Sequence, residues 1–359
     1  IAALKYFRKG ETSLKQLVHR VVHTIRQAGE WQGYFFADQG KIFEEELTFL
    51  IIYQIGSFNS PVWFNCGIFA LFGNAGCSET FAWDFDKKKV EQIATAFIRP
   101  QLSACFIQDV QDDLISIFDL LKSEAKLFKY GSGSGTNFSK LRARGEPIDG
   151  GTGTPGVISY LEIFDRAAQV VRSGGTTRRA AKMVVLDVDH PEVEDFIDWK
   201  VKEERKARML MAGGFGTGLD SEAFRTVSGQ NSNNSVRVTD EFMHKRVKKE
   251  PWALKWRTTG QVARELQADE LFDSLCKAAW ECADPGLQFH DTIQRFHTVP
   301  GAGAIRASNP CSEFLFLDDS ACNLASLNLV KFLDKHGEFD WIAFEKSSRL
   351  FLVAQEILV

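Results

Sequence analysis

Apolar side chains recur at helical spacing near the start of the chain. Between residues 13 and 28 they occupy every third or fourth position behind a serine that can serve as N-cap, so this segment is predicted to be an amphipathic helix. A second apolar helix is expected over residues 43–55, ending before a turn at 58–61 where asparagine, serine and proline follow one another. Residues 62–100 are rich in aromatic side chains and glycine without a clear period. We therefore expect a mainly helical N-terminal region over residues 1–95.

The pattern changes after Gln101, where short β-like runs alternate with helical ones. Alternating strands and helices predict an α/β region with a largely parallel sheet, which we assign to residues 96–359. The predicted strands cover residues 104–108, 183–188 and 235–238, and the predicted helices cover 114–128, 157–171, a segment starting at Pro191, a segment capped by Thr239 and Asp240, and 271–282. The buried face of the helix over 114–128 is expected to hold Leu114, Ile117, Phe118, Leu121, Ala125 and Phe128.

The composition is that of an ordinary globular protein. Of 359 residues, 44% are hydrophobic and 25% are charged, and the formal net charge is -4. Acidic and basic residues are interleaved, which argues against a basic stripe for nucleic acid. No apolar run approaches the roughly 20 residues of a membrane span, and the first residues lack the pattern of a signal peptide. We expect a soluble, cytoplasmic protein that binds neither nucleic acid nor membranes.

The cysteines and the two ends of the sequence indicate the redox state of the thiols and the extent of the chain. Seven cysteines at irregular spacing argue for reduced thiols, so a disulfide in this chain would be catalytic. The chain opens on Ile1 and stops at Val359 inside an apolar helical pattern, and we expect it to be part of a longer protein. Metal binding is not expected, because the sequence has no C-x-x-C or H-E-x-x-H motif. The residues assigned to packing or structural roles are Cys66, Cys77, Cys276, Cys282, His190, His290 and His297.

Three polar loops could bind a ligand. Residues 130–138 are rich in glycine, but they match neither a Walker A loop nor a Rossmann fingerprint, and a close-packed turn explains them as well. Residues 172–179 combine glycines, hydroxyls and arginines, which suits a triphosphate, and an exposed basic turn is the alternative. Residues 228–235 carry amides that can pair with the edge of a base, or they form a polar loop before a strand.

The segment from Ser308 to Glu313 brings a carboxamide, a thiol and a carboxylate close together, and Cys322 follows Cys311 after a short interval. Pro310 disfavours helix at the preceding asparagine and removes a backbone donor, so a tight loop is expected. Such a loop can direct three side chains at one substrate. Taken alone the motif is short, and a turn with a buried cysteine is the more common explanation.

Several separated motifs point to one family. The run Asn309-Pro310-Cys311-Ser312-Glu313, with Cys322 downstream and residues 103–106 far upstream, resembles the catalytic large chain of ribonucleotide reductases. The resemblance extends from about residue 13 to residue 330 in the order of the family's motifs. The segments most similar to the adenosylcobalamin-dependent class II enzymes are residues 58–65, 99–105 and 129–138.

The resemblance implies a reaction, the reduction of ribonucleotides to 2′-deoxyribonucleotides, and a role for each residue of the motif. Cys311 is then the thiyl radical site that takes the 3′ hydrogen of the ribose. Cys105 and Cys322 supply two electrons and become a disulfide, so the fold must bring their Cα atoms to within about 7 Å. Glu313 is the general base, and Asn309 holds the sugar hydroxyls. The implied cofactor is adenosylcobalamin, and the implied reductant is a thioredoxin-like protein or a dithiol.

The resemblance also implies regulation by a deoxynucleoside triphosphate that selects the substrate base. Coupling of this kind needs different contacts in two states of the protein. A homodimer is the assembly that the family implies. The effector-binding residues implied are Asp112, Arg142, Ile148, Arg178 and Arg179, and the residues implied in a specificity loop are Gln230, Asn231, Asn233 and Asn234.

The family fold is a ten-stranded α/β barrel of two parallel five-stranded halves, with the radical cysteine on a central finger loop. We expect this chain to hold the helical N-terminal region, the first half barrel and the finger loop, and to be inactive alone. Two alternatives stay open. The chain could belong to a class I reductase that takes its radical from a separate subunit, or to a non-catalytic nucleotide-binding regulator, which would have no use for three aligned cysteines.

Overall fold

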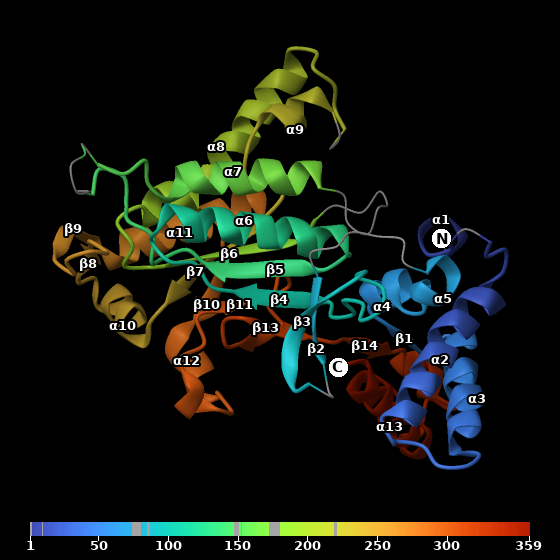
Figure 1. Cartoon of the computed structure of the whole chain (residues 1–359). Helices are drawn as coiled ribbons and strands as arrows, with labels where there is room; N and C mark the ends of the chain where they lie inside the picture. The colour runs from blue at the N-terminus through green and yellow to red at the C-terminus, as the bar shows by residue number, and fades with distance from the viewer. Residues whose placement is uncertain are drawn as a thin grey trace. The chain divides into compact units, whose positions relative to one another are not determined.

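The computed structural model describes residues 2–8, 10–73, 80–84, 87–146, 151, 153–171, 180–218 and 221–359 (Figure 1). These residues form two compact units. The first, called the helical unit, contains residues 1–104 and 322–359, and the second, called the sheet unit, contains residues 105–321. Contacts thus group the C-terminal residues with the N-terminal ones, which the hydrophobic pattern did not indicate.

Three long helices build the helical unit: α2 (Leu14–Trp31), α3 (Gln39–Ile52) and α13 (Trp341–Leu358). Both predicted N-terminal helices are confirmed, although α3 begins and ends a few residues early. At the start of α2, the Ser13 hydroxyl accepts from the Gln16 N–H and the Gln16 side chain accepts from the Ser13 N–H, a capping box that satisfies two donors. Their shared core includes Leu17, Val18, Val21, Val22, Ile25, Phe43, Leu47, Leu50, Phe351, Ala354 and Ile357.

Short elements complete the helical unit. The turn expected at residues 58–61 is instead the start of a helix, because Ser60 opens α4 with Pro61 in its first turn, where a missing N–H costs no hydrogen bond. Within the described ranges, no helix combines the length and the hydropathy needed to cross a bilayer. The elements are α1 (Ala2–Lys5), β1 (Gly56–Phe58), α4 (Ser60–Asn65), α5 (Ile68–Phe72), β2 (Thr80–Asp84), β3 (Lys89–Ile93), β14 (Ala325–Leu327) and η2 (Leu329–Phe332), with β1 antiparallel to β14 and β2 antiparallel to β3.

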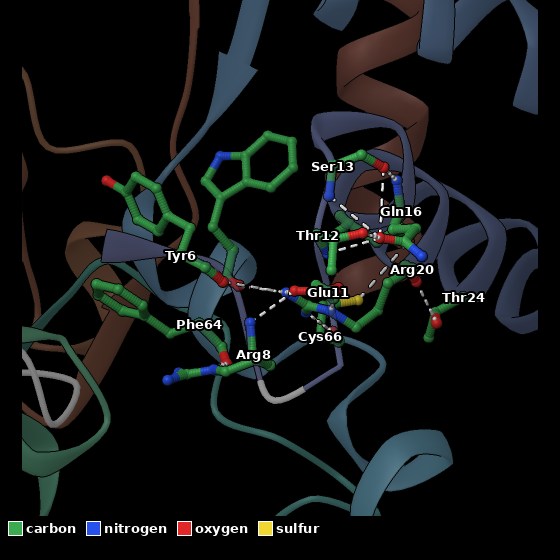
Figure 2. A network of polar contacts seen from close by, with 12 residues as sticks. Tyr6, Arg8, Glu11, Thr12, Ser13, Gln16, Arg20, Thr24, Phe64 and Cys66 are labelled. Carbon is green, nitrogen blue, oxygen red and sulfur yellow. Dashed lines mark hydrogen bonds and ion pairs between the residues drawn. The ribbon is translucent and has the colours of Figure 1, made fainter. Parts of the chain in front are cut away.

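Two arginines bind the carbonyl groups at the end of α4 (Figure 2). Arg20, on α2, forms a buried ion pair with Glu11 at 2.7 Å and donates to the Cys66 carbonyl. Arg8 donates to the Phe64 carbonyl at 2.8 Å. Carbonyl groups at a helix end have no partner inside the helix, so the guanidinium groups satisfy them and fix α4 against α2.

A parallel sheet forms the centre of the sheet unit, as predicted. Its strands are β4 (Cys105–Gln108), β5 (Gly133–Asn137), β6 (Lys182–Asp187), β7 (Asn233–Val238) and β10 (Gly286–Phe289), which pair parallel in the order β10-β7-β6-β5-β4. The short β13 (Ser320–Cys322) is the sixth strand in that order. The described strands make an open sheet, so the expected ten-stranded barrel is not confirmed.

Helices and one hairpin surround this sheet. The predicted helices of the region are confirmed within a few residues as α6, α7, α8, α10 and α11. The hairpin β8–β9 was not predicted, because its polar strand β9 lacks a clear alternation. The elements are α6 (Leu114–Lys129), α7 (Val157–Val170), α8 (Val193–Ala212), α9 (Glu222–Thr226), α10 (Asp240–Lys248), β8 (Pro251–Lys255), β9 (Val262–Gln267), α11 (Ala268–Cys282), α12 (His290–Arg295), η1 (Pro300–Ala302), β11 (Ala307–Ser308) and β12 (Leu315–Phe316).

The two faces of the sheet differ in character. Successive side chains of a strand point to opposite faces, and one face packs on the helices, of which α6 and α7 are seen beside the strands in Figure 1. The core on that face includes Val184, Leu186, Val236 and Val238 from the strands. The other face carries a smaller apolar cluster of Ile107, Met183, Val185 and Ala307, packed by Phe314 and Phe316.

The predicted buried face of α6 is partly wrong. Ile117 and Phe128 are buried as expected, but Leu114 is 56% exposed and Phe118 is 45% exposed. The helix instead buries Glu124, whose carboxylate forms an ion pair with Lys182 of β6, with both side chains 1% exposed. A charge can enter the interior when it is paired, and this pairing rotates the buried face away from the most apolar side of the helix.

Candidate active site

A short hairpin carries the cysteine motif. Strands β11 and β12 pair antiparallel, with Ser308 opposite Leu315, and residues 309–314 form the loop between them. The Asn309 N–H donates to the Phe314 carbonyl at 3.0 Å, and the Asn309 Oδ1 accepts from the Phe314 N–H at 3.0 Å. Ser312 adopts a left-handed conformation with φ of 65°, which turns the chain at the tip. The expected tight loop is therefore confirmed, and Asn309 closes it.

Glycines of β5 let this hairpin lie directly on the sheet. A Cβ atom on Gly135 would fall 1.7 Å from the Ser308 carbonyl oxygen, and one on Gly133 would fall 2.7 Å from Cγ of Pro310. The glycine-rich segment is therefore a close approach of backbone to backbone, as one reading of the sequence proposed, but it is a buried strand rather than a turn. Because Gly133 and Gly135 alternate along β5, they leave room for the hairpin on one face of the strand only.

Polar side chains from neighbouring strands hold the base of the hairpin. Gln288 of β10 donates from Nε2 to the Ser308 hydroxyl at 2.8 Å. Asn137 of β5 donates from Nδ2 to the Arg306 carbonyl at 3.0 Å, and Arg237 of β7 donates to the same carbonyl at 3.1 Å. These donors lie on three different strands, so the position of the hairpin is fixed by the whole sheet.

The thiol and amide groups of the motif meet at the base of the loop. Cys105 is buried at the start of β4, and its Sγ accepts from Asn309 Nδ2 at 3.5 Å. Asn309 is itself 0% exposed. Cys311 and Glu313 are exposed at the tip. Of the predicted catalytic residues, Asn309 and Cys105 thus contact each other, whereas Cys311 and Glu313 are exposed to solvent.

Cys322 belongs to the helical unit. Its side chain is 8% exposed, and its carbonyl accepts from the Ala104 N–H at 2.8 Å within that unit. Ala104 directly precedes Cys105 in the sequence. The pairing of Cys105 with Cys322 remains a prediction.

One residue of the predicted specificity loop, Asn233, forms a hydrogen bond with the hairpin. Asn233 donates from Nδ2 to the Pro310 carbonyl at 2.8 Å. Asn231 binds the Asp165 carboxylate of α7, with its N–H 2.8 Å from Oδ1, and Gln230 donates to the Ser228 carbonyl within its own loop. Asn234 is buried and its Oδ1 accepts from the Ser232 hydroxyl at 2.9 Å. Asn233 and Asn234 belong to strand β7, so the predicted loop is shorter than expected.

The predicted effector residues lie partly in a second polar site. Arg142 forms an ion pair with Asp112, with 2.5 Å between Nε and Oδ2, and its N–H donates to Oδ1 at 3.1 Å. Asp112 lines a cavity of about 310 Å³ beside the carboxyl ends of β4, β5 and β6, where open α/β sheets bind ligands. Ile148, Arg178 and Arg179 lie outside the described residues.

Three basic residues of this cavity were missed from the sequence: Lys140, Arg257 and Arg306. Lys140 follows β5 and pairs with Asp109, but β5 was not predicted as a strand, so the sequence offered no signal for this position. Arg257 comes from the turn of the β8–β9 hairpin and donates to the Asp189 carbonyl at 2.6 Å. The sequence around Arg257 does not indicate that this turn lies beside the sheet, because only the tertiary fold brings the two together.

The titratable groups near this cavity include one carboxyl group with a shifted pKa. Burial, followed by the nearby Asp109 carboxylate, raises the pKa of Asp318 from 3.8 to about 6. A raised pKa means that the folded state binds the proton more tightly than the unfolded state does. The resulting stabilisation is fully present below about pH 4 and is lost as the pH rises through about 6.

Replacing Asp318 with asparagine is expected to stabilise the protein at neutral pH. At pH 7.5 the free energy of unfolding should rise by about 1 kcal/mol, a value reduced from the full pKa shift because water screens this partly exposed group. At pH 4, where Asp318 is protonated, no gain is expected. Urea denaturation at both pH values measures the difference, with Asp273→Asn, which alters an exposed carboxylate on α11, as control. An equal effect at both pH values would contradict the assignment.

Most of the cysteines and histidines that the sequence assigned to packing or structural roles, where the structure describes them, are at least partly buried. Cys66 is buried, which raises the pKa of its thiol to about 12. His190 is also buried, which lowers its pKa to about 4, and its Nε2 lies 3.0 Å from the Leu141 carbonyl oxygen. The packing role of Cys276 is wrong, because this thiol is exposed on α11. Cys77 lies outside the described residues.

The fold and the site define a class of α/β proteins in which a thiol-bearing hairpin docks on the glycine-rich face of a parallel sheet. Residues 103–359 match the family model described as the barrel domain of ribonucleotide reductase, and residues 3–54 match the one described as class II vitamin B12-dependent ribonucleotide reductase. The chain belongs to this family of class II, vitamin B12-dependent ribonucleotide reductases.

Named relatives agree with this assignment. A vitamin B12-dependent ribonucleotide reductase of Rhodopirellula baltica is 46% identical over 353 residues, which cover 97% of this chain and 34% of the relative. One from Streptomyces clavuligerus is 44% identical over 371 residues, which cover 100% of this chain and 36% of the relative. A vitamin B12-dependent ribonucleoside-diphosphate reductase of Mycobacterium tuberculosis is 38% identical over 68% of this chain and 32% of its own length. The chain thus spans about a third of the length of these relatives.

Proposed function

We propose that the whole protein reduces ribonucleotides to 2′-deoxyribonucleotides through a thiyl radical on Cys311, with adenosylcobalamin as cofactor. The observation that carries this proposal is the hairpin, which exposes Cys311 at its tip while its base holds Asn309 against the Cys105 thiol. Membership of the family supports the same reaction, because the relatives are named for it.

The tip of the hairpin is exposed to solvent, which supports the approach of a bulky cofactor. Cys311 and Glu313 are exposed, whereas Ser308 and Asn309 are buried, so the thiol can be approached without displacing the base of the loop. Adenosylcobalamin, when bound, supplies the homolytic chemistry that removes the hydrogen atom from the Cys311 thiol. The steps on the ribose that follow are assigned to side chains of this chain.

The first steps on the substrate use the tip residues. The Cys311 sulfur takes the 3′ hydrogen of the ribose and returns a hydrogen to the same carbon at the end. Glu313 takes the proton of the 3′ hydroxyl, which eases departure of the 2′ hydroxyl as water. General base catalysis of this kind typically contributes about 10²–10⁴-fold to a rate. The left-handed Ser312 between the two residues supports their presentation on one exposed turn.

The reduction steps use the other two cysteines. Cys105 and Cys322 give up two electrons and two protons, so one ribonucleotide and two thiols become one deoxyribonucleotide, one water and one disulfide. Asn309 donates one amide hydrogen to Cys105, and to hold a sugar hydroxyl with the second it must first be uncovered, because it is fully buried in this structure. A thioredoxin-like protein or a dithiol then reduces the disulfide, which closes the cycle.

The same proposal includes regulation and assembly. The polar cavity beside Asp112 supports a nucleotide effector site, because it combines a carboxylate with Lys140, Arg257 and Arg306. The bond from Asn233 to Pro310 supports a route by which residues before β7 act on the catalytic hairpin. We further propose a homodimer in the cytoplasm, in which the five parallel strands form one half of a ten-stranded barrel.

The whole protein is expected to form deoxyribonucleotide from a ribonucleotide, a dithiol and adenosylcobalamin without any partner protein. The name of the Mycobacterium relative makes a diphosphate the first substrate to test, with the triphosphate assayed beside it. Product is measured by chromatography, with and without the cofactor.

Two results would overturn the proposal. Turnover that depends on a second, radical-generating subunit would favour a class I enzyme. Binding of deoxynucleoside triphosphate with no product under any condition would favour a regulator. The comparisons do not favour either alternative.

A further inference from the structure

Two histidines and a glutamate converge on the surface of the helical unit, far along the chain from the cysteine motif. His19 and His23 are separated by one turn of α2, so both rings project from the same side of the helix. Glu44 reaches them from α3, and its side chain is 20% exposed. The two rings lie 4.8 Å apart between centroids.

The distances among these groups match those of a metal site. His23 Nδ1 lies 3.2 Å from Glu44 Oε1, and His19 Nδ1 lies 3.4 Å from the same oxygen. In a tetrahedral zinc site with bonds of about 2.0–2.2 Å, neighbouring ligand atoms are about 3.3–3.6 Å apart. All three ligand atoms lie within 4.8 Å of one another, and rotation of the His19 ring, which is 63% exposed, can close the remaining gap.

The neighbours of Glu44 orient it for this role. Arg26 binds the other carboxylate oxygen, with 2.6 Å between Nε and Oε2. Its Nη2 also lies 3.3 Å from His23 Nδ1, a contact that an ion bound at Nδ1 would replace. Such partners behind a metal ligand fix its orientation. The positive charge of Arg26 is offset by Glu30, whose Oε1 lies 2.7 Å from Nη1 of Arg26. Gly40 of α3 permits this packing, because a Cβ atom there would lie 2.5 Å from the same Glu30 oxygen.

We propose that His19, His23 and Glu44 bind one divalent transition-metal ion of the zinc type, which links α2 to α3. Two neutral imidazoles and one carboxylate are a ligand set that zinc accepts, and water completes the coordination at this open surface. The ion adds a link between two helices that already share apolar packing and the ion pair of Arg26 with Glu44, so its binding stabilises the folded helical unit. This site is separate from the proposed cobalamin chemistry and does not depend on it.

Zinc titration of the tag-free protein, prepared without cobalamin, tests the proposal. Calorimetry at pH 7.5 is expected to give one zinc ion bound per chain, together with a rise in the melting temperature. His19→Ala is the first variant, because this exposed ring can be removed without disturbing the core, and it should weaken zinc binding by about 10-fold or more. Glu44→Gln should do the same. His244→Ala, which removes an exposed histidine on α10, is the matched control and should bind zinc like the unaltered protein.

Cobalt provides a second readout that a mere ion pair would not give. With Co²⁺ as the probe, the protein should show the visible absorption of a tetrahedral site. The variant His19→Cys should retain binding and add a thiolate-to-cobalt band in the near ultraviolet. The proposal is overturned if the unaltered protein binds no zinc, or if His19→Ala and Glu44→Gln bind it as tightly as His244→Ala does.

Discussion

The variant Gly135→Ala is expected to lose ribonucleotide reduction almost completely in the whole protein. Its new methyl group would fall 1.7 Å from the Ser308 carbonyl oxygen, so the hairpin must move by more than an ångström. That movement breaks the contacts of Asn309 with Cys105 and of Gln288 with Ser308. A displacement of this size costs about 10²-fold or more in rate. The strain should also lower the free energy of unfolding by about 1–3 kcal/mol.

The control for this prediction is Gly301→Ala. A Cβ atom at Gly301 meets nothing within 4 Å, so the same chemical change should leave both turnover and stability nearly unchanged. Turnover is measured with saturating substrate and cofactor, and stability by urea denaturation. If Gly135→Ala retained more than half of the normal rate, the hairpin would not need its present position on the sheet.

The variant Cys311→Ser is expected to abolish product formation while the protein stays folded. The side chain is exposed at the tip of the hairpin, and serine is close to cysteine in size, so this change should disturb the fold little. A hydroxyl group holds its hydrogen too strongly to form the radical that the reaction needs. Effector affinity, measured by equilibrium binding of a deoxynucleoside triphosphate, should be nearly the same as in the unaltered protein.

Other cysteines separate the radical role from general thiol effects. Cys276→Ser alters another exposed thiol, on α11, and should leave turnover unchanged. Cys105→Ser and Cys322→Ser should allow attack on the substrate but block reduction of the sugar intermediate, which is seen as consumption of substrate without deoxyribonucleotide. Substantial turnover by Cys311→Ser would remove this residue from the mechanism.

The helices and strands that could be predicted from the sequence are those whose apolar residues recur at a regular spacing or form a continuous run. Helix α2 carries apolar residues on one side and a capping box at its start, and both signals are local. Strand β6 contains a continuous apolar run over residues 183–186, as expected of a strand covered on both faces. The catalytic loop could be located because Pro310 restricts the backbone and because several motifs of one family occur in order.

Elements fixed by distant contacts could not be predicted in this way. Strand β5 contains glycine, serine, threonine and asparagine, which have little tendency to form strands in isolation, and only its neighbours make it one. The buried face of α6 depends on the ion pair between Glu124 and Lys182, which no helical period reveals. The site formed by His19, His23 and Glu44 needs two helices packed side by side, so the spacing within one helix was not enough.

The glycines of β5 have a consequence for the order in which the protein becomes structured. Because Gly133 and Gly135 carry no side chains, most of the hairpin-facing side of this strand gains nothing until the catalytic hairpin covers it. Its stability must come from pairing with β4 and β6 and from the backbone of residues 307–310. The centre of the sheet and the catalytic loop should therefore form in a single cooperative step, so that a chain with an unformed active site is also a chain with an incomplete core.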